Sequence, residues 1–89
     1  MTRRLVFHKR FEKQFSALRQ AQKERVKEAL TDYANGEKSA SLRIHSLSGD
    51  YKRQVSISAG GDLRLHLIDE KTSNDIVVLQ VGTHSQLYG

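Results

Sequence analysis

The sequence predicts an α+β fold: an N-terminal strand and two helices packed on a twisted antiparallel sheet of three to four strands. Two observations predict it. Apolar residues recur three or four positions apart in the first half of the chain, as on one face of a helix, and alternate with polar residues in the second half, as in strands. The 89 residues contain no proline and no repeat that would divide them, so we expect one domain over residues 1–89.

A short strand over 3–7 is predicted to lead into two amphipathic helices. The first helix carries an apolar stripe formed by Phe7, Phe11, Phe15 and Leu18. A weak break at Ala21-Gln22 separates it from the second helix, whose apolar positions are Val26, Ala29, Leu30, Tyr33 and Ala34. We expect the second helix to end at Asn35-Gly36, because both residues tolerate a left-handed conformation.

The second half of the chain predicts an antiparallel meander. Val55 and Ile57 alternate with polar residues before a turn over 59–62, and Leu63, Leu65 and Leu67 alternate in the next strand. After a polar turn over 69–75, the segment 76–81 has apolar residues at both even and odd positions. A strand buried on both faces has this pattern, so we expect 76–81 to lie centrally in the sheet.

Alternation also predicts a polar face on the side of the sheet away from the helices. Its members are Lys52, Gln54, Ser56, Ser58, Arg64 and His66. Paired strand residues share a face, so Arg64 and His66 should neighbour Gln54, Ser56 or Ser58 across the hairpin. Such a basic, hydroxyl-rich face is either a floor that binds anions or the ordinary wet face of an antiparallel sheet.

The net charge of +5 is concentrated at the start of the chain. Residues 1–30 hold nine basic and three acidic side chains, a net of +6, and the remainder nets −1. Such a segment indicates an anionic partner (nucleic acid, an acidic protein or a membrane surface) or simply a solvated helix face. The sequence has no cysteine, which excludes disulfide scaffolds and thiolate chemistry and favours the cytoplasm. It also has no apolar run of about 18 residues, so no membrane span is predicted.

Histidines are the most informative residues for chemistry. His45, His66 and His84 are not spaced at i,i+2 or i,i+4, as local metal ligands are, so we predict no metal site and no other cofactor. His8 begins the first helix and is expected to be a surface or capping residue.

Acid–base cleavage of RNA fits the histidines better than metal binding. The reaction needs a base for the 2′-hydroxyl, an acid for the leaving 5′-oxygen and cations for the phosphorane. Histidine suits both proton roles at neutral pH; Lys52 and Arg64 would hold the phosphate, and Tyr88 would stack on an unpaired base. Spacing alone leaves structural roles open: His45 as a turn cap, His84 as a tail residue and Tyr88 as a core residue.

Three stretches of the chain resemble the RelE/ParE superfamily of bacterial type II toxins, especially its YafQ-like branch. They are Phe7-His8-Lys9-Arg10-Phe11, His45-Ser46-Leu47-Ser48-Gly49 with Tyr51-Lys52 after it, and Val81-Gly82-Thr83-His84-Ser85-Gln86-Leu87-Tyr88-Gly89. The last stretch is the most specific, since a G-[TS]-H-x-x-L-aromatic ending is typical of YafQ-like proteins. The resemblance covers nearly the whole chain.

The resemblance implies a RelE-like microbial RNase fold and a ribosome-dependent, metal-independent mRNA endonuclease that halts translation. Its implied partners are the ribosome, mRNA and an acidic cognate antitoxin that inhibits the toxin; operator DNA is bound only through the complex with the antitoxin. Bacterial cytoplasm is the implied location. The basic start of the chain would dock the antitoxin or the ribosome, through Arg3, Arg4, Lys9, Arg10 and Lys13.

Residue by residue, the resemblance implies three catalytic residues, and our own hypothesis adds His66 as a fourth. His45 matches the histidine of the family's H-x-L-x-G block, Asp62 the acidic residue before the next strand, and His84 the C-terminal histidine. His66 stands where the family has a tyrosine. The implied contacts to RNA are Lys52 with its neighbour Arg53, Arg64 and Tyr88.

The chain departs from the family on two strands, of which the second carries His66 in place of the tyrosine. YafQ-like toxins usually carry Asp-x-His where this chain has Ser56-Ile57-Ser58, and our hypothesis is that His66 takes over part of the missing histidine's work. Two other functions stay open: a ParE-like gyrase poison, and a catalytically weakened relative that binds RNA or protein.

Overall fold

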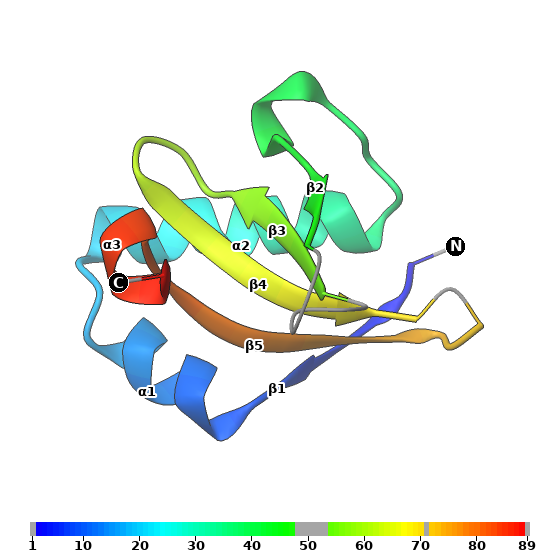
Figure 1. The fold of residues 1–89 in the computed structure, drawn as a ribbon, viewed down its shortest axis with the longest axis horizontal. Coiled ribbons are helices and arrows are strands. Elements are labelled where there is room, and N and C mark those ends of the chain that lie inside the picture. The colour runs from blue at the N-terminus through cyan, green and yellow to red at the C-terminus, as the bar shows by residue number, and fades with distance from the viewer. Residues whose placement is uncertain (1, 48–53, 71, 89) are drawn as a thin grey trace.

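The computed structural model describes residues 2–47, 54–70 and 72–88 (Figure 1). Along the chain the elements are β1 (Arg4–Phe7), α1 (Lys9–Ser16), α2 (Gln20–Ala34), the 3₁₀ turn η1 (Ala40–Leu42), β2 (His45–Ser46), β3 (Gln54–Ser58), β4 (Leu63–Asp69), β5 (Asp75–Thr83) and α3 (His84–Tyr88). The predicted α+β class is confirmed. No helix in these described ranges is long and apolar enough to cross a membrane.

The sheet has five strands in the order β1-β5-β4-β3-β2. β1 runs parallel to β5, and the other pairs are antiparallel. The prediction of three to four antiparallel strands is therefore corrected to a mixed five-stranded sheet. The helices α1 and α2 follow β1 in the chain, and β5, which comes much later, runs beside β1 in the same direction. No local sequence pattern predicts a pairing between segments so far apart. The extra strand β2 is only two residues long, too short to show alternation.

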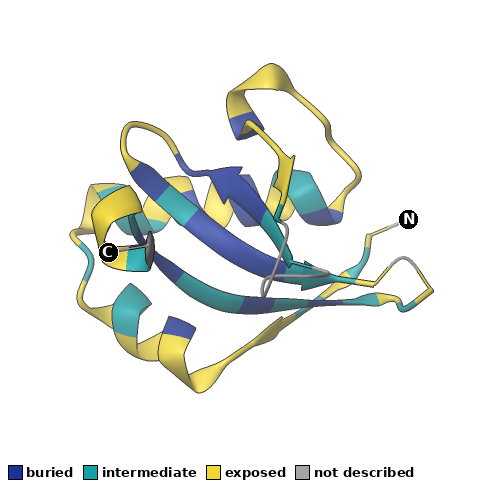
Figure 2. Ribbon diagram, viewed as in Figure 1, coloured by how far each residue is buried: buried dark blue, intermediate teal, exposed yellow. Residues whose placement is uncertain are grey.

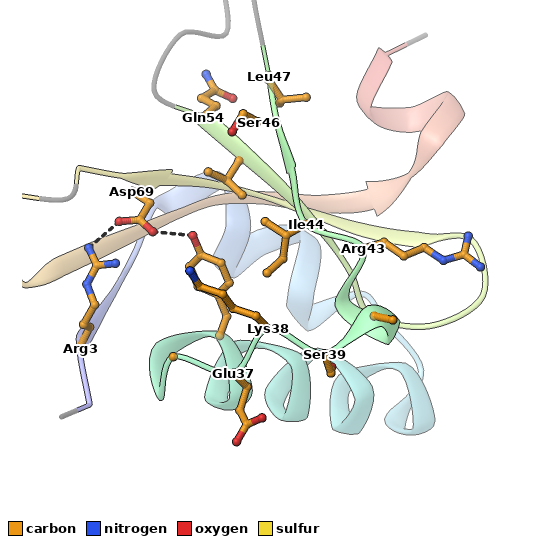
Figure 3. Close-up of a pocket in the computed structure, with 14 residues that line it drawn as sticks. Arg3, Glu37, Lys38, Ser39, Arg43, Ile44, Ser46, Leu47, Gln54 and Asp69 are labelled. Carbon is orange, nitrogen blue, oxygen red and sulfur yellow. Dashed lines mark hydrogen bonds and ion pairs between the residues drawn. The ribbon is translucent and has the colours of Figure 1, made fainter.

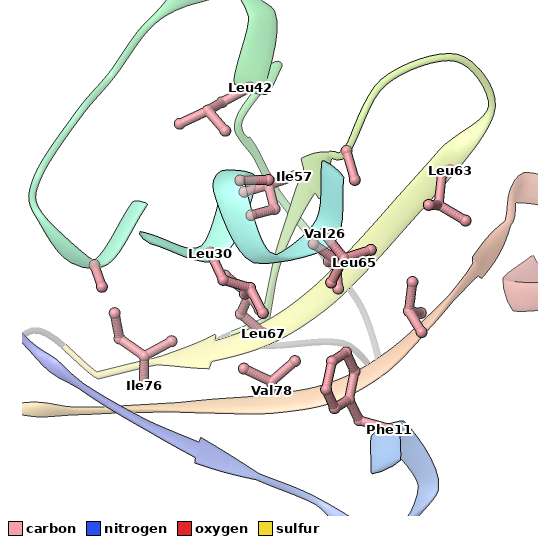
Figure 4. Packing of buried hydrophobic residues seen from close by; sticks show 14 residues of the cluster. Phe11, Val26, Leu30, Leu42, Ile57, Leu63, Leu65, Leu67, Ile76 and Val78 are labelled. Carbon is pink, nitrogen blue, oxygen red and sulfur yellow. The ribbon is translucent and has the colours of Figure 1, made fainter. Parts of the chain in front are cut away.

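The hydrophobic core joins the two main helices to the sheet (Figure 4). Phe11 of α1 and Val26 and Leu30 of α2 cluster with inward residues of the strands. Leu65 and Leu67 are fully buried, as the alternation predicts, and the darkest part of the burial view follows the middle of the sheet (Figure 2). The inner face of the sheet therefore packs against the helices.

The boundary between the helices lies earlier than predicted. α1 ends at Ser16 and α2 begins at Gln20, so the predicted break at Ala21-Gln22 is wrong. The Gln22 side chain explains the shift: its Oε1 accepts a hydrogen bond from the backbone N–H of Arg19 at 3.1 Å, which closes off the first turn of α2. The predicted end of α2 is confirmed, with Gly36 at φ 84°.

β5 lies inside the sheet, as predicted, but a β-bulge accounts for part of its double apolar pattern. His66 pairs with Gln80, whereas the next residue, Leu67, pairs with Val78, so Leu79 has no ladder partner. The bulge switches which residues of β5, even-numbered or odd-numbered, face the core. Val78 before it and Val81 after it are therefore both buried.

Candidate functional site

A groove of about 380 Å³ brings together three of the residues singled out from the sequence. Its lining residues are His45, Ser46, Leu47, Ser56, Arg64 and His84. His45 comes from β2, Arg64 from β4 and His84 from the start of α3. Two imidazoles and one guanidinium from distant parts of the sequence therefore face one cavity.

Strand register explains this convergence. His45 lies across from Ser56 on β3, and Arg64 lies between Ser58 of β3 and Gly82 of β5. The predicted pairing of the polar face is thus confirmed. β5 continues directly into α3. His84, the residue after the last one of β5, therefore lies at the same groove as Arg64.

His66 lies on β4, two residues beyond Arg64 on the same strand. It pairs with Ser56 on β3 and Gln80 on β5, so a row of polar residues runs from His45 across four strands. The His66 side chain is fully buried, and its Nδ1 lies 2.9 Å from Nε2 of Gln80. Burial disfavours the imidazolium and lowers the pKa of His66. His66 does not line the groove, so any part it takes in catalysis acts through its neighbours.

The predicted open polar face is wrong at its centre. Ser56 and Ser58 are only 5% and 6% exposed and His66 is not exposed at all. Among the described residues of this face, Ser56 and the half-buried Arg64 line the groove. The anion-binding interpretation therefore applies to the part of the face at the groove.

Of the other residues predicted for catalysis or RNA binding, the structure describes the side chain of Asp62 alone. Asp62 is exposed in the turn between β3 and β4 and is not among the groove's lining residues. Lys52 and Arg53 lie outside the described residues. Tyr88 belongs to α3, but its side chain is outside what the structure describes.

In the predicted basic docking surface, two cations pair with carboxylates, and the other three make no such pair with any residue that the structure describes. Arg3 lies 2.6 Å from Asp69, and Arg4 makes a two-point contact with Asp75 at 2.8 and 3.0 Å. These contacts raise the pKa of both guanidinium groups, chiefly through the side-chain hydrogen bonds, and lower that of Asp75. The remaining predicted docking cations, Lys9, Arg10 and Lys13, are exposed. His8 caps α1 by accepting a hydrogen bond from the Arg10 backbone N–H, as predicted.

A second, larger cavity of about 870 Å³ was not predicted. It adjoins the groove at β2, since Ser46 and Leu47 line both cavities. At one end the Tyr33 hydroxyl donates to Asp69, which also pairs with Arg3 (Figure 3).

Ser46 was not predicted as a groove residue, although it directly follows His45 in the sequence. Ser56, a member of the predicted polar face, also lines the groove. Within the described ranges, no group of three or more His, Cys, Asp or Glu side chains is placed to hold a metal ion.

Comparison with known proteins gives a clear result for structure and none for sequence. The sequence matches no protein-family model and no curated protein. The structure is similar to YafQ from E. coli, with a TM-score of 0.83 and 19% identity over 98% of this chain and 99% of that one. It is similar to YafQ in the E. coli DinJ-YafQ toxin-antitoxin complex, with a TM-score of 0.82 and 19% identity over 100% of both chains.

An archaeal structure matches as well. The RelE-RelB complex from Pyrococcus horikoshii has a TM-score of 0.73 and 20% identity, over 97% of this chain and 99% of that one. The resemblance seen in the sequence is thus confirmed at the level of structure: the chain has the RelE/YafQ-like toxin fold.

Proposed function

We propose that this protein is the toxin of a type II toxin–antitoxin system and acts as a ribosome-dependent, metal-independent mRNA endonuclease. The observation that carries the proposal is the groove in which His45, Arg64 and His84 meet. Likeness of fold alone does not assign an activity. The groove supplies the three groups that cleavage of a phosphodiester requires.

The reaction divides among these groups as follows. One imidazole accepts the proton of the 2′-hydroxyl, whose oxygen attacks the phosphorus and forms a cyclic phosphate. The other imidazole donates a proton to the 5′-oxygen as its bond to phosphorus breaks. The Arg64 guanidinium holds the phosphate and stabilises the charge of the phosphorane. Histidine suits both roles because its usual pKa of about 6.5 leaves both forms accessible.

An acidic antitoxin is the proposed protein partner. Structurally similar YafQ occurs in a complex with DinJ, and similar RelE with RelB. On this chain the exposed cations Lys9, Arg10 and Lys13 follow closely in the sequence after two exposed apolar residues, Val6 at 37% and Phe7 at 45%. A surface with both features suits a partner segment that is acidic and apolar.

Induction in bacterial cells separates this function from the alternatives. We expect incorporation of labelled methionine to stop before incorporation of labelled thymidine, because translation is the process attacked. His84→Ala, induced to the same protein level, should leave both rates near normal. Thymidine incorporation stopping first would indicate a gyrase poison, and no arrest with either label would indicate an inactive relative.

A further inference from the structure

We propose that Gln86 and Thr83 form a positioning pair that fixes the turn from β5 into α3 and thereby holds the His84 imidazole at the groove. Neither residue lines the groove, and neither was assigned a role from the sequence. The inference deepens the proposed function, on which its activity measurement rests.

Two reciprocal hydrogen bonds define the pair. The backbone N–H of Thr83 donates to Oε1 of Gln86 at 2.8 Å, and the backbone N–H of Gln86 donates to Oγ1 of Thr83 at 3.3 Å. This is the geometry of a capping box, in which a residue before the helix and one three positions later satisfy each other's N–H groups. His84 is the first residue inside the turn that the box closes.

α3 needs such a restraint. It has five residues, and helices shorter than about 12 residues are marginal in water on their own. His84 is exposed, so its position depends on the backbone that carries it more than on burial. The reciprocal bonds fix that backbone at the residue before His84 and at the residue two after it.

Gly82 leaves the space that the pair occupies. A Cβ on Gly82 would lie 2.9 Å from Oε1 of Gln86, closer than real Cβ atoms come, and 3.2 Å from Cβ of Gln86, which is tighter than nine in ten such contacts. Gly82 also lies opposite Arg64 in the β4–β5 ladder. The missing side chain therefore lets α3 fold against β5 beside the guanidinium, with the Gln86 oxygen over the Thr83 N–H.

The first measurement needs no activity. By NMR, Gln86→Ala should speed exchange of the Thr83 amide proton by about fivefold or more and move the His84 backbone shifts toward coil values. Gln86→Glu should restore both, because glutamate offers the same acceptor oxygen in a capping box. Gly82→Ala should resemble Gln86→Ala. Gln20→Ala, which removes an exposed glutamine side chain from α2, is the matched control and should change neither.

The second measurement uses the single-turnover rate of mRNA cleavage on ribosomes, with folding of each variant checked by thermal unfolding. Gln86→Ala should lower this rate about ten- to hundredfold while leaving the protein concentration for half-maximal rate nearly unchanged, because a misplaced catalytic group costs rate. Gln86→Glu should recover most of the rate. In the His84→Ala background, Gln86→Ala should cost nothing further, since its effect passes through His84.

Two results would overturn the inference: an unchanged Thr83 amide in Gln86→Ala, or an equal loss of rate with and without His84. The second result would make Gln86 a residue of general structural importance. If the wild-type protein cleaves no ribosome-bound mRNA, the proposed function fails, and the NMR measurement still decides whether the pair fixes His84.

Discussion

At the scale of single residues, His66 shows how the fold changes the chemistry of a side chain. It was expected on an open polar face, yet it is fully buried between Ser56 and Gln80. Burial lowers its pKa, so the folded protein holds it as neutral imidazole near pH 7. The ring nitrogen bound to Gln80 then contributes to the sheet's packing as a neutral polar group.

This lowered pKa predicts how stability depends on pH. The unfolded chain binds a proton at His66 near pH 6.5, whereas the folded chain binds it only at lower pH. Stability from this group is therefore complete above pH 6.5 and is lost as the pH falls from there toward the folded-state pKa. Urea unfolding of wild type should show this loss between pH 7.5 and 5, and the loss should be smaller in His66→Gln. Equal pH dependence in the two proteins would contradict this account of His66.

The hypothesis that His66 contributes to catalysis has a separate test. If it supports proton transfer through its neighbours, His66→Ala slows cleavage of ribosome-bound mRNA at a protein concentration and temperature where the variant remains folded. A wild-type rate in the folded variant would remove His66 from the mechanism and leave it a structural role.

At the scale of elements, one ion cluster ties the first residues of the chain to α2 and β4. Asp69, at the end of β4, accepts a hydrogen bond from the Tyr33 hydroxyl at 2.5 Å and pairs with Arg3 at 2.6 Å. The Asp69 side chain is 11% exposed and that of Arg3 26%. The pKa of Tyr33 is raised, first by burial and then by its bond to Asp69.

Breaking this cluster should cost measurable stability. We expect Asp69→Ala, which removes the carboxylate, to lower the free energy of unfolding by about 1.5–3 kcal/mol, the usual range for a hydrogen bond to a charged group. Tyr33→Phe should cost about 1 kcal/mol, and the double variant should cost less than the sum, because both changes remove the bond between Tyr33 and Asp69. Urea denaturation measures all three. Strictly additive losses would show that the two side chains do not interact in solution.

The elements also show what the sequence could predict. Alternation gave the faces and pairing of β3 and β4, because residues that pair across a ladder must share a face. The parallel pairing of β1 with β5 depends on contacts between residues some 70 positions apart, as in Arg4 with Asp75, and no local period encodes it. The start of α2 depended on one side-chain bond from Gln22, which outweighed the apolar pattern.

The candidate site, like the fold, could be predicted from the sequence only in part. His45, Arg64 and His84 were found from the motifs, and the structure places all three at one groove. The burial of His66 and the position of Asp62 outside the groove were not predictable, because alternation says which face a residue takes and not what covers that face.

At the scale of the whole molecule, long-range pairing decides which part of the basic charge is available. Of the predicted docking cations, Arg3 and Arg4 are held by Asp69 and Asp75. The docking charge is therefore expected to come from Lys9, Arg10 and Lys13 on α1.

Charge reversal tests this assignment. Glutamate at Lys9, Arg10 and Lys13 together should reduce co-sedimentation with ribosomes at low salt about fivefold or more, and the difference should shrink as salt screens the charges. The matched control replaces three other exposed cations, Arg19, Lys27 and Lys38, and changes net charge equally. Equal losses in the two triple variants would show that net charge, and not the α1 surface, governs binding.

The central claim is that the groove of His45, Arg64 and His84 cleaves mRNA on the ribosome. Primer extension of an mRNA on purified ribosomes, incubated with the protein and without added divalent metal beyond what the ribosomes require, tests it most directly. The account predicts a discrete cut with wild type, and losses of about 10²–10⁴-fold in His45→Ala and His84→Ala, the usual contribution of a general acid or base. No cut with folded wild-type protein, or less than about a threefold loss in both variants, would contradict it.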